Sequence, residues 1–421
     1  MRKNNLITLF TILITILLLN IQISATGGYL RHGYGVKYSA MAGSGVALSL
    51  SSIGFATNPA SLAFLGTRYD INAAYFSPSR NYEIIGAPSG FPGTFGLIPG
   101  TVESDSKGFP VPSMAANWQL GPYAFGLGVV ANGGMNTDYP TATFFDPTSP
   151  GTGVDLEQAI IGATFSIKLN RNHAIGVTGL YGYQRFAAKG LLSFSGFSSD
   201  PTALTGNRHS TSTGFGVRFG YLGKLSKYIS IGASYQTKMS MGEFDEYKGL
   251  FAEKGGFDIP ANWVAGISVK PSKKLTLNFD LQQILYSDIK SIGNPLLPNL
   301  MTSRLGDTNG AGFGWQDIFV YKFGGMYKIN KDWTLMFGYS YGQQPVPDSE
   351  VLFNILAPGV VQNHITFGVS KKIGRSHEIN FSFMYAPNTS VTGPNPLEAP
   401  GKQNITIEMN QFQVEVGYSI F

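Results

Sequence analysis

The chain has 421 residues, including 30 Phe and 21 Tyr, and only 13% of its residues are charged. Because Cys is absent, disulfides and thiolate metal sites are excluded. The formal net charge is only +5, and the Lys and Arg residues are scattered along the sequence, whereas a nucleic-acid-binding surface would concentrate them.

Residues 1–25 have the pattern of a secretory signal peptide. Arg2 and Lys3 form a basic start, residues 6–19 are apolar, and Ala25 is a small residue suited to cleavage. The alternative is a permanent membrane anchor, but a spanning helix needs roughly 20 apolar residues, and no stop-transfer charges follow this run. We therefore expect cleavage after Ala25 and export of the chain.

Residues 26–67 are small, glycine-rich and largely apolar, and they do not alternate like a strand. Only Arg31 and Lys37 are charged in this segment. A disordered segment would carry more charge and less hydrophobicity. We therefore expect it to pack against the rest of the protein.

Fourteen runs of alternating apolar and polar residues fill the rest of the chain. Successive strand side chains point to opposite faces, so each run predicts a β-strand with one apolar and one polar face. The strands are expected at about 68–76, 110–119, 123–131, 158–168, 173–184, 211–224, 228–239, 259–270, 274–284, 315–328, 332–341, 362–372, 376–386 and 405–421.

The gaps between these runs are alternately long and short. The short ones are 121–122, 169–172, 225–227, 271–273, 329–331 and 373–375, while the long ones run from 86–106 to 387–404. Tight turns on one rim and long loops on the other are typical of an outer-membrane β-barrel, whose closed sheet has no unpaired edge in lipid. We therefore predict one all-β domain, an antiparallel transmembrane barrel of 14 strands over residues 68–421, with both termini in the periplasm.

The last strand ends at Phe421, an aromatic terminus of the kind that the barrel-assembly machinery usually reads, although it lies one place out of register with the apolar face. Fourteen strands enclose a bore wider than their own side chains fill. The segment 26–67 is therefore expected inside the barrel as a plug, or hatch, in which Asn58, Pro59 and Ala60 fix a bend against the wall.

The chain resembles the FadL/TodX family of outer-membrane long-chain fatty-acid and hydrocarbon transporters over essentially all of its mature length. The similarity rests on short motifs in order: Gly43-Ser44-Gly45-Val46-Ala47, Asn58-Pro59-Ala60, Gly126-Leu127-Gly128-Val129, Gly133-Gly134-Met135, Tyr183-Gln184-Arg185-Phe186, Phe257-Asp258-Ile259-Pro260, Gly312-Phe313-Gly314-Trp315-Gln316-Asp317 and Phe353-Asn354-Ile355-Leu356-Ala357-Pro358-Gly359. The resemblance implies a monomeric, hatch-plugged barrel that moves hydrophobic molecules inward.

Two apolar clusters on the long loops are the first candidate site: Phe186, Leu191, Leu192 and Phe194 in the third loop, and Phe244, Tyr247, Leu250 and Phe251 in the fourth. The spacing of the second cluster predicts one face of a helix. Each cluster either packs its own loop or faces the other across a groove that collects lipids, because exposed apolar patches are costly. The family resemblance implies such a groove.

Two charged residues are predicted to face the lumen. The aromatic neighbours of Arg218 and Lys322 set the lipid face and turn these two inward, since a charge facing lipid costs about 2–4 kcal/mol. They can pair with Asp280 or meet a fatty-acid carboxylate. Separately, Gly133 and Gly134 after the third strand permit a bend or bulge. The resemblance implies a lateral exit there, while loop flexibility explains the glycines equally well.

These features predict passive uptake of long-chain fatty acids or other hydrophobic compounds across the bacterial outer membrane, without a cofactor, metal, enzymatic activity or nucleic-acid partner. A general porin is the first alternative, but it would have a charged constriction and no plug. A lipid hydrolase is the second; the five His residues have no catalytic partner at triad spacing and no G-x-S-x-G motif occurs. Asp307 and Asp317 flank a glycine-rich stretch, yet solvated loop carboxylates are commoner than calcium ligands.

Overall fold

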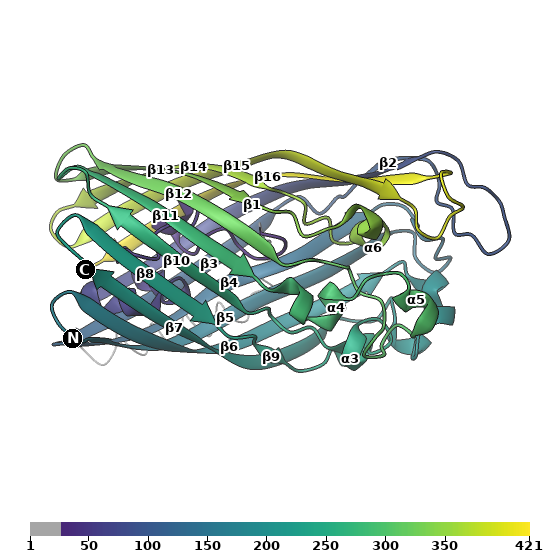
Figure 1. Cartoon of the computed structure of the whole chain (residues 1–421), viewed down its shortest axis with the longest axis horizontal. Helices are drawn as coiled ribbons and strands as arrows, with labels where there is room; N and C mark the ends of the chain where they lie inside the picture. The colour runs from purple at the N-terminus through teal and green to yellow at the C-terminus, as the bar shows by residue number, and fades with distance from the viewer. Residues whose placement is uncertain (1–26) are drawn as a thin grey trace.

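The computed structural model describes residues 27–421, so the predicted signal peptide lies outside the described residues. Its strands form one antiparallel sheet that closes on itself, because β16 pairs with β1 from Tyr69–Ile420 to Ile85–Asn404 (Figure 1). Of its sixteen strands, β2 (Gly100–Glu103) and β9 (Ser240–Met241) are short additions at one end, and the other fourteen close the barrel. The predicted fold class is confirmed.

The barrel strands are β1 (Arg68–Ile85), β3 (Phe109–Leu120), β4 (Tyr123–Tyr139), β5 (Thr152–Lys168), β6 (His173–Lys189), β7 (Ser210–Lys224), β8 (Ile229–Gln236), β10 (Asn262–Val269), β11 (Leu275–Ile284), β12 (Ile318–Lys328), β13 (Trp333–Gly342), β14 (Asn363–Ile373), β15 (His377–Pro394) and β16 (Asn404–Ile420). Six short turns join them at one end, the turn rim, and seven long loops, L1 to L7, join them at the other, the loop rim.

The loops carry only short helices: η3 (Leu192–Phe197), η4 (Pro201–Ala203), η5 (Asp245–Tyr247), α3 (Ala252–Gly255), η6 (Tyr286–Asp288), α4 (Lys290–Gly293), α5 (Asn299–Thr302), η7 (Asp348–Glu350) and α6 (Val351–Asn354). Within residues 27–421, none of the helices is long and apolar enough to cross a membrane.

Several strands reach further toward the loop rim than predicted. The expected end of the first strand at residue 76 is wrong, because β1 continues to Ile85. Its outward residues change from apolar, as at Tyr75, to polar, as at Ser77, while Tyr82 and Ile84 beyond that point are buried inside. The apolar face therefore switches from outside to inside at this level of the barrel, and a search for one continuous apolar face stops there.

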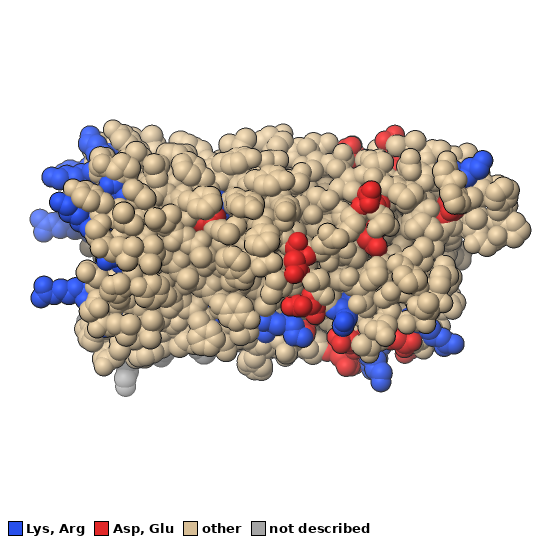
Figure 2. All heavy atoms as spheres, in the orientation of Figure 1, with Lys and Arg blue, Asp and Glu red and all other residues tan. Residues whose placement is uncertain are grey.

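The basic residues are scattered along the sequence, but many of them gather at one end of the barrel (Figure 2). Figure 2 shows many Lys and Arg side chains gathered at the turn-rim end of the barrel. The residues in and beside the turns are Lys168, Arg171, Lys224, Lys227, Lys270, Lys273, Lys274, Lys328, Lys331, Lys371, Lys372 and Arg375. Residues far apart in the chain meet here because every second connection returns to the same rim.

The N-terminal segment, residues 27–67, lies inside the barrel (purple in Figure 1). It contains α2 (Val36–Ser39), η1 (Ser52–Ala56) and η2 (Pro59–Phe64). Two barrel carboxylates hold its backbone: Asp280 accepts the N–H groups of Gly45 and Val46 at 2.7 and 2.9 Å, and Asp70 accepts that of Ser52 at 2.6 Å. Buried N–H groups need such partners, so the segment is fixed rather than loosely enclosed.

Glycines on the inner wall make room for this segment. A Cβ at Gly176 would lie 2.6 Å from the carbonyl carbon of Pro59, and one at Gly338 would lie 2.3 Å from that of Met41. The same close approach to the segment occurs at Gly126, Gly128, Gly162, Gly220, Gly232, Gly324 and Gly368. Glycine is the residue that allows such backbone contact within a strand.

Candidate functional site: two apolar cavities above the N-terminal segment

The third- and fourth-loop clusters meet beneath the loop rim. The ring of Phe186 packs against Phe251, Tyr247 and Phe244, with centroids 4.6, 4.9 and 5.6 Å apart. The predicted helix over the fourth-loop cluster is wrong: η5 is a single turn, and Glu253 in α3 has φ of 58°. Burial against Phe186, which lies in β6 rather than in the third loop as predicted, brings these side chains to one side without a helical repeat.

Part of the two clusters surrounds a narrow outer cavity with a volume of about 30 Å³. Its lining is Val154, Phe186, Leu191, Phe194, Leu204, Leu250, Phe251, Ser291, Leu305, Ala311, Gly312, Phe313, Phe353 and Leu356. The hydroxyl of Ser291 is already bonded to the carbonyl of Gly256. Phe244 and Tyr247 pack behind the lining, and Leu192 lies outside it. The cavity therefore offers apolar surface alone.

Burial also affects two groups in the loops near this cavity. It raises the pKa of Tyr247, whose hydroxyl donates to the carbonyl of Asn207 at 2.8 Å. It likewise raises the pKa of Glu350, whose Oε2 accepts the N–H of Leu296 at 2.8 Å. In both cases burial disfavours the charged form of the side chain.

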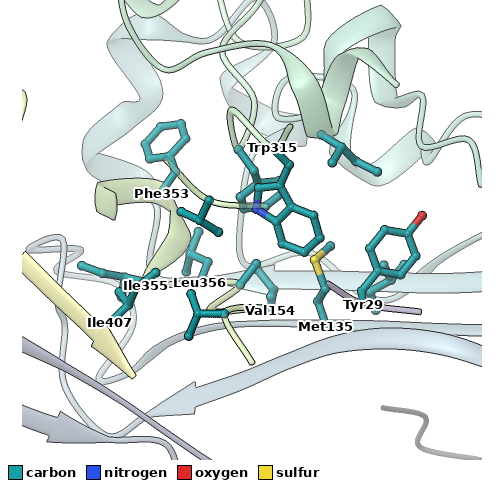
Figure 3. Packing of buried hydrophobic residues seen from close by; sticks show 14 of the residues in the cluster. Tyr29, Met135, Val154, Trp315, Phe353, Ile355, Leu356 and Ile407 are labelled. Atoms are coloured by element: carbon teal, nitrogen blue, oxygen red, sulfur yellow. The ribbon is translucent and has the colours of Figure 1, made fainter. Parts of the chain in front are cut away.

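A narrow inner cavity, with a volume of about 20 Å³, adjoins the outer one toward the barrel wall. Its lining is Gly28, Phe76, Arg80, Gly134, Met135, Asn136, Trp315, Ala357, Pro358, Gly359 and Met409. Figure 3 shows Trp315 between Phe353 and Leu356 of the outer cavity and Met135 of the inner one. Leu356 lines one cavity and Ala357 the other, so consecutive residues of L6 lie between them.

The inner cavity lies at a break in the wall between β3 and β4, here named the seam. The two strands pair only from Ser113–Val130 to Leu120–Tyr123, and among the described strands β4 continues beyond Val130 with β5 alone. Its register shifts between Ala131 and Gly133, so Asn132 forms the bulge. The predicted bend at Gly133 and Gly134 thus coincides with the seam.

The N-terminal segment occupies the inner side of the seam. Arg31 N donates to the carbonyl of Asn132 at 3.3 Å, and Gly134 N donates to that of Tyr29 at 3.2 Å. A Cβ at Gly133 would lie 2.0 Å from the carbonyl oxygen of Tyr29. Gly133 is therefore required by the close approach of the segment.

The sequence pattern agrees with this architecture. The family model described as "Outer membrane protein transport protein (OMPP1/FadL/TodX)" matches residues 20–410. The chain belongs to this family. Membership places the FadL/TodX barrel described here in an outer membrane and assigns it to the transport of hydrophobic compounds. No curated protein sequence matches the chain significantly.

Solved structures share the fold of this FadL/TodX-family barrel. The toluene transporter TodX of P. putida is 17% identical, with a TM-score of 0.68 over 92% of this chain and 98% of that one. The toluene transporter TbuX of Ralstonia pickettii is 18% identical, with a TM-score of 0.63 over 92% and 98%. A FadL homologue of Pseudomonas aeruginosa is 14% identical, with a TM-score of 0.67 over 93% and 99%.

Arg218 and Lys322 both lie inside the barrel, and both contact the N-terminal segment. Lys322 donates to the carbonyl of His32 at 3.0 Å, and Arg218 donates to that of Thr57 at 3.5 Å and to Gln236 at 2.5 Å. Neither forms an ion pair within 4 Å of a carboxylate among the described residues. Asp280 faces Lys322 across the β11–β12 ladder, but its carboxylate accepts the backbone N–H groups of Gly45 and Val46 and forms no direct ion pair with Lys322.

Arg80 is a functional candidate that the sequence pattern misses. It is 5% exposed, lies over the ring of Phe109, and donates to the carbonyl of Ser106. Its Nε has no hydrogen-bond partner, and no carboxylate of the described residues pairs with it. Arg80 lies beyond residue 76, where the first strand was expected to end. The sequence signal that could have identified it is a single Arg on the inward face of the strand, whose other inward residues there are mostly apolar.

The alternative sites have little support among the described residues. His209 pairs with Asp155 at 2.8 Å on the exposed loop rim. Asp317 accepts from Ser287 and Asp307 from Arg304, so these two carboxylates serve different loop contacts. Residues 27–421 contain no group of three His, Asp or Glu residues placed to hold a metal.

Proposed function

We propose that this protein takes up long-chain fatty acids or similarly hydrophobic compounds by diffusion. The observation that carries the proposal is the pair of adjoining apolar cavities, which lead from the loops to the seam above a lumen occupied by the N-terminal segment. At about 30 Å³ the outer cavity must widen by movement of its lining side chains before a hydrocarbon chain can enter. The chain then loses contact with water, which is favourable by about 25 cal/mol per Å² of apolar surface buried. Binding of this kind needs no energy source. In this proposal the barrel acts as a monomer, and its turn rim and both chain termini face the periplasm.

In this proposal the N-terminal segment is the hatch. Asn58, Pro59 and Ala60 hold it against β7, where Asn58 donates to the carbonyl of Tyr221 at 2.9 Å. Arg218 and Lys322 hold it in the resting state rather than binding cargo. Cargo in the inner cavity leaves when the segment moves, either sideways through the seam beside Gly133 and Gly134 or inward to the periplasm.

Arg80 favours an acidic cargo. A buried guanidinium without a carboxylate partner is costly, and the carboxylate of a fatty acid in the inner cavity would satisfy it. The chain of the same molecule would then occupy the outer cavity, past Trp315. The toluene transporters with this fold are named for a neutral aromatic cargo, which makes neutral hydrocarbons the competing cargo class.

Uptake by cells that lack their own fatty-acid transporter tests the proposal. Leu250→Ser with Phe251→Ser should weaken uptake of a labelled long-chain fatty acid well over tenfold at limiting concentration. Each side chain contributes roughly 1.5–3 kcal/mol when buried against an acyl chain, and about 1.4 kcal/mol is a factor of ten.

The matched control is Met301→Ser, an exposed apolar residue on L5 that does not line either cavity. Ala311→Phe, which fills the outer cavity without exposing a polar group, should reproduce the loss. Unchanged uptake by both cavity variants, at wild-type levels of folded barrel, would remove the outer cavity from the route.

A further inference from the structure

A second apolar hollow, the rim groove, lies on the loop rim between L1 (86–108) and L2 (140–151). Its apolar walls include Ile84, Leu97, Ile98, Val102 and Phe145, and its volume is about 500 Å³. Ligand pockets typically enclose about 300–1,000 Å³. The rim groove is therefore large enough for a hydrocarbon chain, and Ile98, which is 70% exposed, leaves apolar surface open to an incoming molecule.

Phe145 is held in this groove by a strained backbone. Its φ of 57° lies in the left-handed region, which a bulky residue rarely adopts. Its side chain nevertheless remains 43% exposed, so the strain is not explained by burial. Such outliers persist only where the surroundings enforce them, and they cluster at functional sites.

A row of aromatic rings joins the rim groove to the outer cavity. Phe145 contacts Phe95 of L1 with centroids 5.8 Å apart, and Phe95 contacts Phe194 of L3 at 5.4 Å. Phe194 in turn lines the outer cavity and contacts Phe353 of L6 at 5.2 Å. A molecule in the groove is thus two ring contacts from the cavity proposed to receive cargo.

The charges of the groove select against an acid. Asp146 is its only charged lining residue, and no Lys or Arg of the described chain lines it. The carboxylate of Asp146 is already engaged by Thr148 N at 2.8 Å and Leu192 N at 3.0 Å. A ligand carboxylate in the groove would therefore have no cation to pair with and would be repelled by the carboxylate of Asp146.

We propose that the rim groove binds an uncharged hydrocarbon chain or ring and passes it over Phe95 and Phe194 into the outer cavity. This makes the groove a second entrance, selective for neutral cargo, whereas Arg80 deeper in the protein favours acids. The inference rests on the proposed uptake function, and it concerns a binding site that can be measured separately from uptake.

Photolabelling of the purified full chain in lipid nanodiscs tests the inference. The probes are a sixteen-carbon alcohol and the corresponding acid, each carrying a diazirine on the chain, with labelled residues located by mass spectrometry. The alcohol should label residues 97–102 and 141–147 saturably, and the acid should label them much less. Ala142→Trp, which fills the groove, should cut this labelling at least tenfold while labelling in the outer cavity persists.

Phe145→Gly separates binding from folding. Glycine adopts positive φ without strain, so the variant should unfold at a temperature no lower than wild type, yet lose most of the groove labelling. Labelling confined to the outer cavity, or groove labelling unchanged in Ala142→Trp, would overturn the inference. So would a stable dimer whose formation protects the groove, since the occupant would then be a second copy. A wild-type protein that labels in the groove but takes up no hydrophobic compound would instead refute the proposed function alone.

Discussion

At the scale of single residues, the glycines on the inner wall explain part of the high glycine content, which the strand pattern alone does not explain. The chain has 53 Gly, and many of them lie where the N-terminal segment touches the wall. Strand β6 offers a matched pair: a Cβ at Gly176 would lie 2.6 Å from the carbonyl carbon of Pro59, whereas one at Gly179 meets only a carbonyl oxygen at 4.0 Å. The two residues point to opposite faces.

We therefore expect Gly176→Leu to displace the segment. Overpacking costs typically about 1–3 kcal/mol, so the variant should unfold at a lower temperature, and ion conductance in planar bilayers should rise. Gly179→Leu on the same strand should behave like wild type in both measurements. Equal behaviour of the two variants would mean that the segment does not depend on the glycine at this contact.

Arg80 gives a second prediction at this scale. Hydrogen bonds to charged groups contribute about 1.5–3 kcal/mol, so Arg80→Gln should weaken binding of a long-chain fatty acid roughly tenfold or more, since about 1.4 kcal/mol is a factor of ten. The fatty alcohol of the same length should bind as before, and Arg80→Lys should keep part of the preference. Isothermal titration with both ligands measures this, and an unchanged acid-to-alcohol ratio would contradict the role of Arg80.

At the scale of elements, the N-terminal segment determines whether the lumen of the barrel is blocked or open to ions. Deleting residues 27–66 should leave a water-filled bore and raise ion conductance, because the inner wall retains polar side chains such as Asp70, Asn72 and Asp280. The variant must first be shown to be folded by its gel migration. A conductance equal to that of wild type would place the seal elsewhere.

The elements in lipid could be predicted from the sequence, and those beyond it could not. Strands such as β11 and β13 alternate regularly because one face meets lipid throughout. By contrast, β15 continues to Pro394, beyond its expected end at residue 386, and its pairing with β16 shifts register between Ala386 and Thr389. The loop clusters were found as apolar residues, but their shared cavity depends on L5 and L6, whose side chains have no periodic pattern.

At the scale of the whole molecule, closure of the sheet predicts resistance to detergent. All barrel strands are paired, with β1 and β16 completing the ring, so in sodium dodecyl sulfate the protein should stay folded until it is boiled. Unboiled and boiled samples should migrate differently on a gel, and circular dichroism of the unboiled protein should be rich in β-structure. A helical spectrum would contradict the fold.

The basic turn rim is also a property of the whole molecule. Each Lys or Arg near an anionic lipid surface contributes about 1 kcal/mol of attraction. A ring of such residues favours placement of this end against phosphate headgroups, in keeping with the proposed orientation of the turn rim toward the periplasm. This ring is not apparent from the sequence, because the turns that contribute its Lys and Arg residues are separated along the chain by pairs of strands and a long loop.

The position of the N-terminal segment has a consequence for biogenesis. The segment precedes β1 in the chain, yet it contacts strands as distant as β14, where Thr366 donates to the carbonyl of Ala40 at 2.9 Å. Closure of β1 on β16 completes the wall around it. The N-terminal segment, which is synthesised first, therefore gains its full set of contacts only when the last strand is in place. A defect in the final hairpin would therefore leave the N-terminal segment without the closed wall against which it packs.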